Sequence, residues 1–170
     1  MKRFVAALAL LASVALCASP AFSATNTKTI TFASHYSGHA SLLIDNGHAT
    51  ISSVAGAGKN SLFGTSRVSG SGSALASQQC DPFGGKGSIV GRGNKITFVI
   101  SRSMSQGCSN GSSGPVTVTF KGVAKATGGS GDATGASGSL KFSGTLKLGG
   151  TSGAQNGSFT VTLGGTLSVR

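Results

Sequence analysis

Apolar and polar side chains alternate with a period of two along most of the chain after residue 27. In the clearest run, Val116, Val118 and Phe120 alternate with polar residues through Lys125. Successive side chains of a strand point to opposite faces, so this pattern predicts strands with one buried and one solvated face, as in antiparallel sheets. The same alternation, with apolar or glycine residues in phase, recurs at positions 96–100, 140–148 and 159–169.

Turn motifs and weaker alternation extend this pattern. Asp45-Asn46-Gly47 separates two apolar segments and is a strong hairpin signal. Residues 85–90 are predicted to pair with residues 95–101 across Gly91–Asn94. The total is eight or nine strands joined by short turns, with no helix long enough for a β-α-β unit. Weaker strand segments are expected at positions 30–32, 42–44, 49–51 and 62–75.

Glycines at the inward-phase positions 122, 144 and 165 favour closure of these strands into a barrel. Inward glycines permit sharp coiling and tight interior packing, and closure removes exposed edge strands. We therefore expect an all-β fold, a small closed antiparallel β-barrel of about eight strands. A β-sandwich is the second choice, and a trimeric β-solenoid is the third because the strand spacings show no fixed repeat.

The N-terminal segment has the pattern of a secretory signal peptide. Lys2 and Arg3 precede an apolar run from Phe4 to Ala18, and Ala21-Phe22-Ser23 matches a cleavage site. The run is shorter than the roughly 20 apolar residues of a membrane-spanning helix. We predict a signal peptide at 1–23, a single barrel domain at 24–170 and a secreted or periplasmic location.

Two cysteines, Cys80 and Cys108, remain after the predicted cleavage. An even number of cysteines in an oxidising compartment favours a disulfide, and neither residue has the CxxC partner of a zinc site. The two lie fourteen residues on either side of Asn94, so a bridge would join the outer ends of the hairpin centred there. We predict this disulfide and no metal site.

Positions 127–139, with the sequence TGGSGDATGASGS, resemble the segment GGTGxFxxAxGxxxxxG of secreted bacterial proteins in the allene oxide cyclase-like barrel superfamily. This superfamily also includes plant dirigent proteins. Positions 157–167 are similar to the final strand of such barrels, and positions 61–66 to an early strand. The resemblance covers roughly residues 55–169 and implies an eight-stranded antiparallel barrel. Asp132 stands where the family usually has an aromatic plug residue.

The acidic residues give little support to catalysis. The resemblance implies that a cyclase-like enzyme would use a Glu inside the barrel, and this chain has no Glu. Its three acids, Asp45, Asp81 and Asp132, are in turn-like sequences, where Asp side chains accept hydrogen bonds from nearby backbone N–H groups. We predict no catalytic residue and no cofactor.

Three histidines offer a second candidate for chemistry. His35 and His39 flank Tyr36, and His48 lies across the following hairpin. Residues four apart on a strand share a face but stand about 13 Å apart, which is too far for one metal ion. We therefore expect loop or surface histidines.

The exported chain keeps twelve Lys and Arg against three Asp, a net charge near +9. The outward-phase residues Lys121, Lys125, Lys141 and Lys147 are candidates for polyanion binding, although such lysines can also serve solubility alone. The charges are spread singly and aromatic residues outside the core phase are few, which disfavours specific nucleic-acid binding.

The sequence thus favours a non-catalytic exported barrel, either structural or binding a small apolar ligand or an anionic cell-surface polymer. The alternatives are a cyclase-like isomerase acting on a small apolar substrate and an adhesin-like surface protein. The interior would discriminate between them. A deep apolar cavity with Asp or His inside would favour the enzyme, and a barrel filled by Phe98, Phe120, Phe142 and Phe159 would oppose it.

Overall fold

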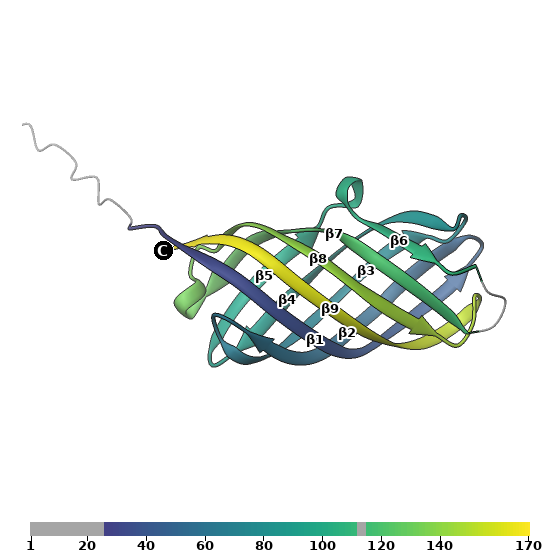
Figure 1. The fold of residues 1–170 in the computed structure, drawn as a ribbon, viewed down its shortest axis with the longest axis horizontal. Helices are drawn as coiled ribbons and strands as arrows, with labels where there is room; N and C mark the ends of the chain where they lie inside the picture. The colour runs from purple at the N-terminus through teal and green to yellow at the C-terminus, as the bar shows by residue number, and fades with distance from the viewer. Residues whose placement is uncertain (1–25, 112–114) are drawn as a thin grey trace, which may run out of the picture.

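The computed structural model describes residues 26–111 and 115–170, so the predicted signal peptide lies outside the described residues. The described chain is almost entirely strand (Figure 1). Its elements are β1 (Lys28–Asp45), β2 (His48–Asn60), β3 (Gly64–Leu75), β4 (Cys80–Gly91), β5 (Asn94–Ile100), β6 (Gln106–Ser109), β7 (Val116–Ser130), β8 (Ser137–Leu148) and β9 (Gly153–Val169), with short 3-10 turns η1 (Arg102–Met104) and η2 (Gly131–Ala133). Within residues 26–111 and 115–170, no helix is long and apolar enough to cross a bilayer.

The strands close into an eight-position antiparallel barrel, as the alternation predicted. The first and last strands pair along nearly their whole length, from Lys28 opposite Val169 to Ile44 opposite Gly153. The pairing of β3 with β4 completes the ring. β5 and β6 together occupy one position, since both lie between β4 and β7. Closure excludes the open sandwich.

β5 and β6 are one strand interrupted by η1. The β4–β5 ladder ends with Gly85 opposite Ile100, and the β4–β6 ladder resumes with Pro82 opposite Gln106. In the register of the first ladder, Pro82 would face residue 103. The difference of three residues equals the length of η1, Arg102–Met104, which is extruded from the wall.

The predicted disulfide between Cys80 and Cys108 is present, with the two residues directly opposite and their Cα atoms 4.0 Å apart. The geometry expected from the sequence, which placed both cysteines fourteen residues from a hairpin centred on Asn94, was incomplete. The hairpin turns at Arg92 and Gly93, both with positive φ, and not at Asn94. In that register Cys80 would face Ser105, and the extruded η1 is what brings Cys108 into place.

The most deeply buried side chains lie in one half of the barrel. This closed end contains both ends of the described chain, the turns after β2 and β4, and η2 (Figure 1). Its interior is packed with apolar side chains. The largest fully buried residues are Phe32, Tyr36, Phe63, Ile89, Ile96, Leu140 and Leu167.

Two buried asparagines fix the turns of the closed end. Asn60 Nδ2 donates to Tyr36 Oη at 3.0 Å, and its Oδ1 accepts from the backbone N–H groups of Leu62 and Phe63 at 2.9 and 2.6 Å. Asn94 exchanges two hydrogen bonds with Asp132, which tie η2 to the β4–β5 turn. Buried polar groups are thus satisfied where the chain reverses direction.

Residues 61–66, expected as a strand, are in part a turn. Ser61–Phe63 form the connection after β2, and β3 begins at Gly64, whose φ is +67°. The side chain of Phe63 is buried in the core although it belongs to a turn. A buried apolar residue at this position resembles the inward position of a strand, which is why the segment was expected to be one. The separate weak segments at 30–32 and 42–44 belong to one continuous strand, β1.

In the middle of the barrel, phenylalanine rings lie over inward glycines of other strands. A methyl group built at Gly87 would lie 2.7 Å from Phe98 Cζ, and one at Gly56 would lie 2.7 Å from Phe159 Cζ. Real Cβ atoms do not approach other atoms so closely, so these rings require glycine beneath them. The same relation holds for Phe120 with Gly144 and for Phe142 with Gly122.

Loss of the disulfide should destabilise the fold. The bridge closes a sequence separation of 28 residues. Such a cross-link contributes about 3–4 kcal/mol in the chain-entropy model, so Cys80→Ser should lower the melting temperature by roughly 6–16 °C. The double variant, Cys80→Ser with Cys108→Ser, should have the same melting temperature as the single variant, because both lack the same bond. A melting temperature equal to that of the parent protein would show that the thiols are not joined.

Gly56→Ala should be destabilising by about 1–3 kcal/mol, because the new methyl group meets the Phe159 ring. Denaturation in urea measures this change. Gly164→Ala is the matched control, because a methyl group there meets nothing nearer than Phe32 O at 3.8 Å. Equal effects of the two substitutions would contradict the ring-over-glycine packing.

Candidate ligand cavity

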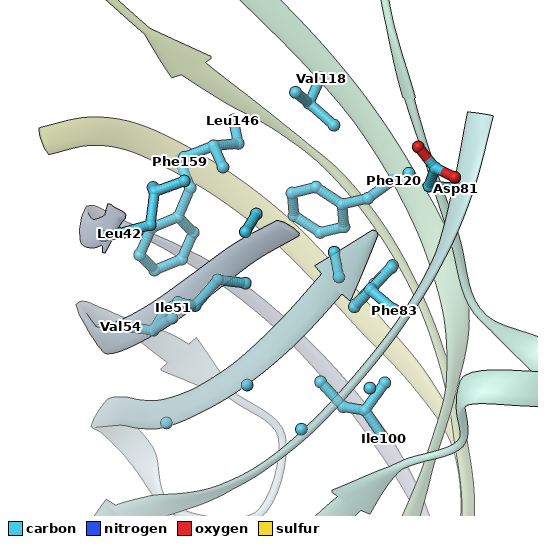
Figure 2. Close-up of a pocket in the computed structure, with 18 of the residues that line it drawn as sticks. Leu42, Ile51, Val54, Asp81, Phe83, Ile100, Val118, Phe120, Leu146 and Phe159 are labelled. Atoms are coloured by element: carbon cyan, nitrogen blue, oxygen red, sulfur yellow. The ribbon is translucent and has the colours of Figure 1, made fainter. Parts of the chain in front are cut away.

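The other half of the barrel encloses an apolar cavity of about 330 Å³ (Figure 2). Side chains from β1 and β2, such as Leu42, Ile51 and Val54, face it from one side. Val118 and Leu146 face it from β7 and β8. These are inward-phase positions of strands whose outward positions are polar, so the alternation that builds the barrel also makes the lining apolar.

A layer of phenylalanines separates the cavity from the packed closed end. Phe83, Phe120 and Phe142 contact one another, with ring centroids 5.9 to 6.3 Å apart in edge or tilted arrangements. Phe98 and Phe159 complete this phenylalanine floor. The four rings named from the sequence therefore lie in the middle of the barrel. The cavity lies in the other half, beside a second cluster of buried side chains: Leu42, Ala49, Val116 and Leu148.

One wall of the cavity is formed by backbone. Gly70 and Gly72 of β3 pair with Gly87 and Gly85 of β4, all in the inward phase. The atoms nearest to a methyl group built at Gly72 or Gly85 belong to the backbone of the paired strand, and no ring lies among them. Because β3 and β4 send few side chains inward here, the space between this wall and the opposite side stays open.

The rim at the open end carries polar side chains beside apolar ones such as Leu75 and Ala76. Gln78 and Gln79 come from the connection between β3 and β4, Ser109 from the end of β6 and Thr151 from the turn between β8 and β9. The cavity thus runs from aromatic rings at its floor to amide and hydroxyl groups at its mouth.

Asp81 is the one carboxylate among the described lining residues, and it is 7% exposed. Its Oδ2 accepts from the backbone N–H groups of Ser77 and Gln78 at 2.9 and 2.8 Å. The predicted turn role of this residue is therefore confirmed. Its bonds hold the connection that forms part of the rim.

The other two acids also lie in turns, with different partners from those expected. Asp45 accepts from the Asn46 side chain at 3.1 Å, and Asp132 accepts from the Asn94 side chain at 3.1 Å. Both partners are side chains, whereas backbone N–H groups were predicted. Neither acid lines the cavity.

The histidines do not converge. His35 and His39 point outward from β1, while Tyr36 between them is fully buried and bonded to Ser66 at 2.9 Å. His48 begins β2. In the part of the chain that the structure describes, no group of three His, Cys, Asp or Glu could hold a metal ion.

The candidate lysines lie on the outer wall, as predicted, but not as one stripe. Lys141 of β8 pairs with Val123, which lies between Lys121 and Lys125 on β7, so these three are neighbours. Lys147 pairs with Thr117, four residues further along β7. Lys86 of β4 joins the three because Val99 pairs with both Lys86 and Lys125.

Sequence reasoning did not locate the cavity. The available signal was the pair Gly72 and Gly85, two inward glycines that face each other and have no phenylalanine ring over them. Pairing partners were needed to use it, and the partner of β3 was not assigned.

Comparison with protein-family models, curated proteins and solved structures found no match to this chain. The resemblance to the allene oxide cyclase-like superfamily stays a prediction.

Asp81→Ala should loosen the rim. The backbone N–H groups of Ser77 and Gln78 would lose their acceptor and become open to solvent, because both residues are exposed. Hydrogen exchange at these two amides should accelerate. Asp45→Ala, in an exposed turn, serves as the control and should leave those amides unchanged. Equal exchange in both variants would contradict the role assigned to Asp81.

Proposed function

We propose that this protein binds a small apolar molecule in the open half of its barrel, without catalysing a reaction on it. The observation that carries the proposal is the cavity of about 330 Å³ above the phenylalanine floor. Pockets that hold small molecules measure about 300–1,000 Å³ and are lined mainly by aliphatic and aromatic groups. The size and the lining of this cavity both meet that description.

The lining also restricts the ligand. Each square ångström of apolar surface removed from water contributes about 25 cal/mol, so a hydrocarbon body gains most from the aliphatic walls. A charged group placed against Phe120 or Phe142 would be desolvated without a partner. Polar groups of the protein are at the rim, at Gln78, Gln79 and Thr151. The favoured ligand is therefore uncharged and largely hydrocarbon, with any polar group at its outer end.

The environment of Asp81 favours binding over isomerisation. A cyclase-like enzyme would direct a carboxylate at its substrate. The Asp81 carboxylate instead accepts two backbone hydrogen bonds and organises the rim. In this arrangement the acid supports the entrance and is engaged away from the floor, where an apolar molecule would lie.

The proposal can be tested with phenylnaphthylamine, an uncharged dye whose emission rises in apolar surroundings. We expect saturable binding at one site per barrel. Val118→Trp should weaken binding by about tenfold or more, because the indole would occupy space that the ligand needs. Val118 is half-buried and faces the cavity.

Val90→Trp is the matched control, because Val90 is 44% exposed on the outer wall of β4. It should bind the dye as the parent protein does. Circular dichroism would establish that both variants are folded. Equal binding by the two tryptophan variants, or a signal that never saturates, would contradict binding in the barrel.

A further inference from the structure

The outer wall over β4, β5, β7 and β8 carries a cluster of exposed cations that surrounds η1. We call it the basic face, and it is defined by Lys86, Arg102, Lys121, Lys125 and Lys141 with the exposed apolar residues Val99 and Met104. Only part of this set could be named from the sequence, because Lys86 lies on β4 and Arg102 in η1, and only the strand pairing brings them next to the lysines of β7 and β8.

Strand pairing makes the basic face compact. Lys86, Val99 and Lys125 stand in one row across three strands. Neighbouring strands are about 4.8 Å apart, so the two lysine backbones are separated by about 10 Å. Lys141 lies diagonally from Lys125 and Lys121, at the 7–8 Å or so typical of diagonal pairs in antiparallel sheets.

The extruded turn η1 stands out from the wall between β5 and β6 (Figure 1). Arg102 folds back along the surface and donates to the carbonyl and hydroxyl groups of Ser73 at 3.3 and 3.1 Å. Met104 is 53% exposed, and Val99 in the adjoining row is 47% exposed. The basic face therefore presents apolar side chains among its cations, with Met104 on its most prominent feature.

Acidic side chains do not offset these cations. Asp45 lies in the β1–β2 turn, Asp81 points into the barrel, and Asp132 belongs to η2 at the closed end. The outer wall of β9, on the far side of β8, carries Ser, Thr, Asn and Gly. Five of the twelve described Lys and Arg residues thus lie together on this face with no carboxylate among them, and most of the other seven lie at the closed end.

We propose that the basic face docks on the surface of a lipid bilayer that contains anionic lipid. Anionic head groups complement the lysines, and the boundary between head groups and acyl chains accepts a thioether and a valine. A sulfated or phosphorylated polymer would satisfy the charges and leave Met104 and Val99 in water, so the exposed apolar residues favour the lipid surface. This proposal does not depend on what occupies the cavity.

The test measures sedimentation of the protein with vesicles of phosphatidylglycerol and phosphatidylcholine in equal parts, and with vesicles of phosphatidylcholine alone. Binding should require the anionic lipid and weaken with salt. Each Lys near such a surface is worth about fivefold in partitioning. Lys125→Gln with Lys141→Gln should therefore lower the partition coefficient by about tenfold or more. All variants keep the same N-terminus, so any contribution of residues 1–25 cancels.

Lys28→Gln with Lys59→Gln removes the same charge from β1 and β2, on another side of the barrel, and should change partitioning by less than about twofold. Met104→Ser should lower partitioning several-fold and leave retention on heparin resin unchanged. Leu43→Ser is its control, because Leu43 is 50% exposed on the outer wall of β1. It should have no effect on either measurement.

Three outcomes would overturn the proposal. The parent protein could fail to bind the anionic vesicles. The two pairs of lysine substitutions could reduce binding equally, which would indicate that the net charge of the protein, and not the basic face, determines binding. Met104→Ser could leave vesicle binding unchanged while Lys125→Gln with Lys141→Gln lowers retention on heparin, which would indicate a polymer-binding face.

Discussion

In the middle of this small closed barrel, four phenylalanine rings need space on neighbouring strands, and inward glycines provide it. The rings of Phe98, Phe120, Phe142 and Phe159 each lie over an inward glycine of another strand. This packing sets the level of the phenylalanine floor, which separates the fully packed half of the barrel from the half that contains the cavity. Above the floor, glycine faces glycine on β3 and β4, and the wall there is bare backbone. Glycine thus makes room for the phenylalanine floor and also leaves the cavity open above it.

The period-two alternation was sufficient to predict the strands because inward and outward positions are chemically distinct on nearly every strand, and the inward glycines favoured their closure into a barrel. The hairpin signals at Asn46-Gly47 and Arg92-Gly93 worked for the same local reason, since left-handed residues are needed there. Features that depend on pairing between distant strands were missed. The extrusion of η1 changes the register by three residues, and the cavity depends on which strand faces Gly72. Likewise, Lys86 and Lys125 lie in one row because both pair with Val99 of β5, which lies between them.

The interior and the exterior suggest complementary roles. The interior is apolar except at its rim, where Asp81 fixes the connection that contains Gln78. The exterior is uncharged over β9 and cationic around η1. If η1 lies against an anionic bilayer, the barrel wall rests on the surface that is also the richest source of apolar molecules. The two proposals nevertheless rest on separate residues and can fail separately.

The most direct measurement is a crystal structure of the protein soaked with a brominated alkane, in which anomalous scattering locates the bromine. We predict one bromine site above the phenylalanine floor, between Val118 and the backbone wall of Gly72 and Gly85. An open half filled by its own side chains, or bromine bound only on the outer wall, would contradict this account.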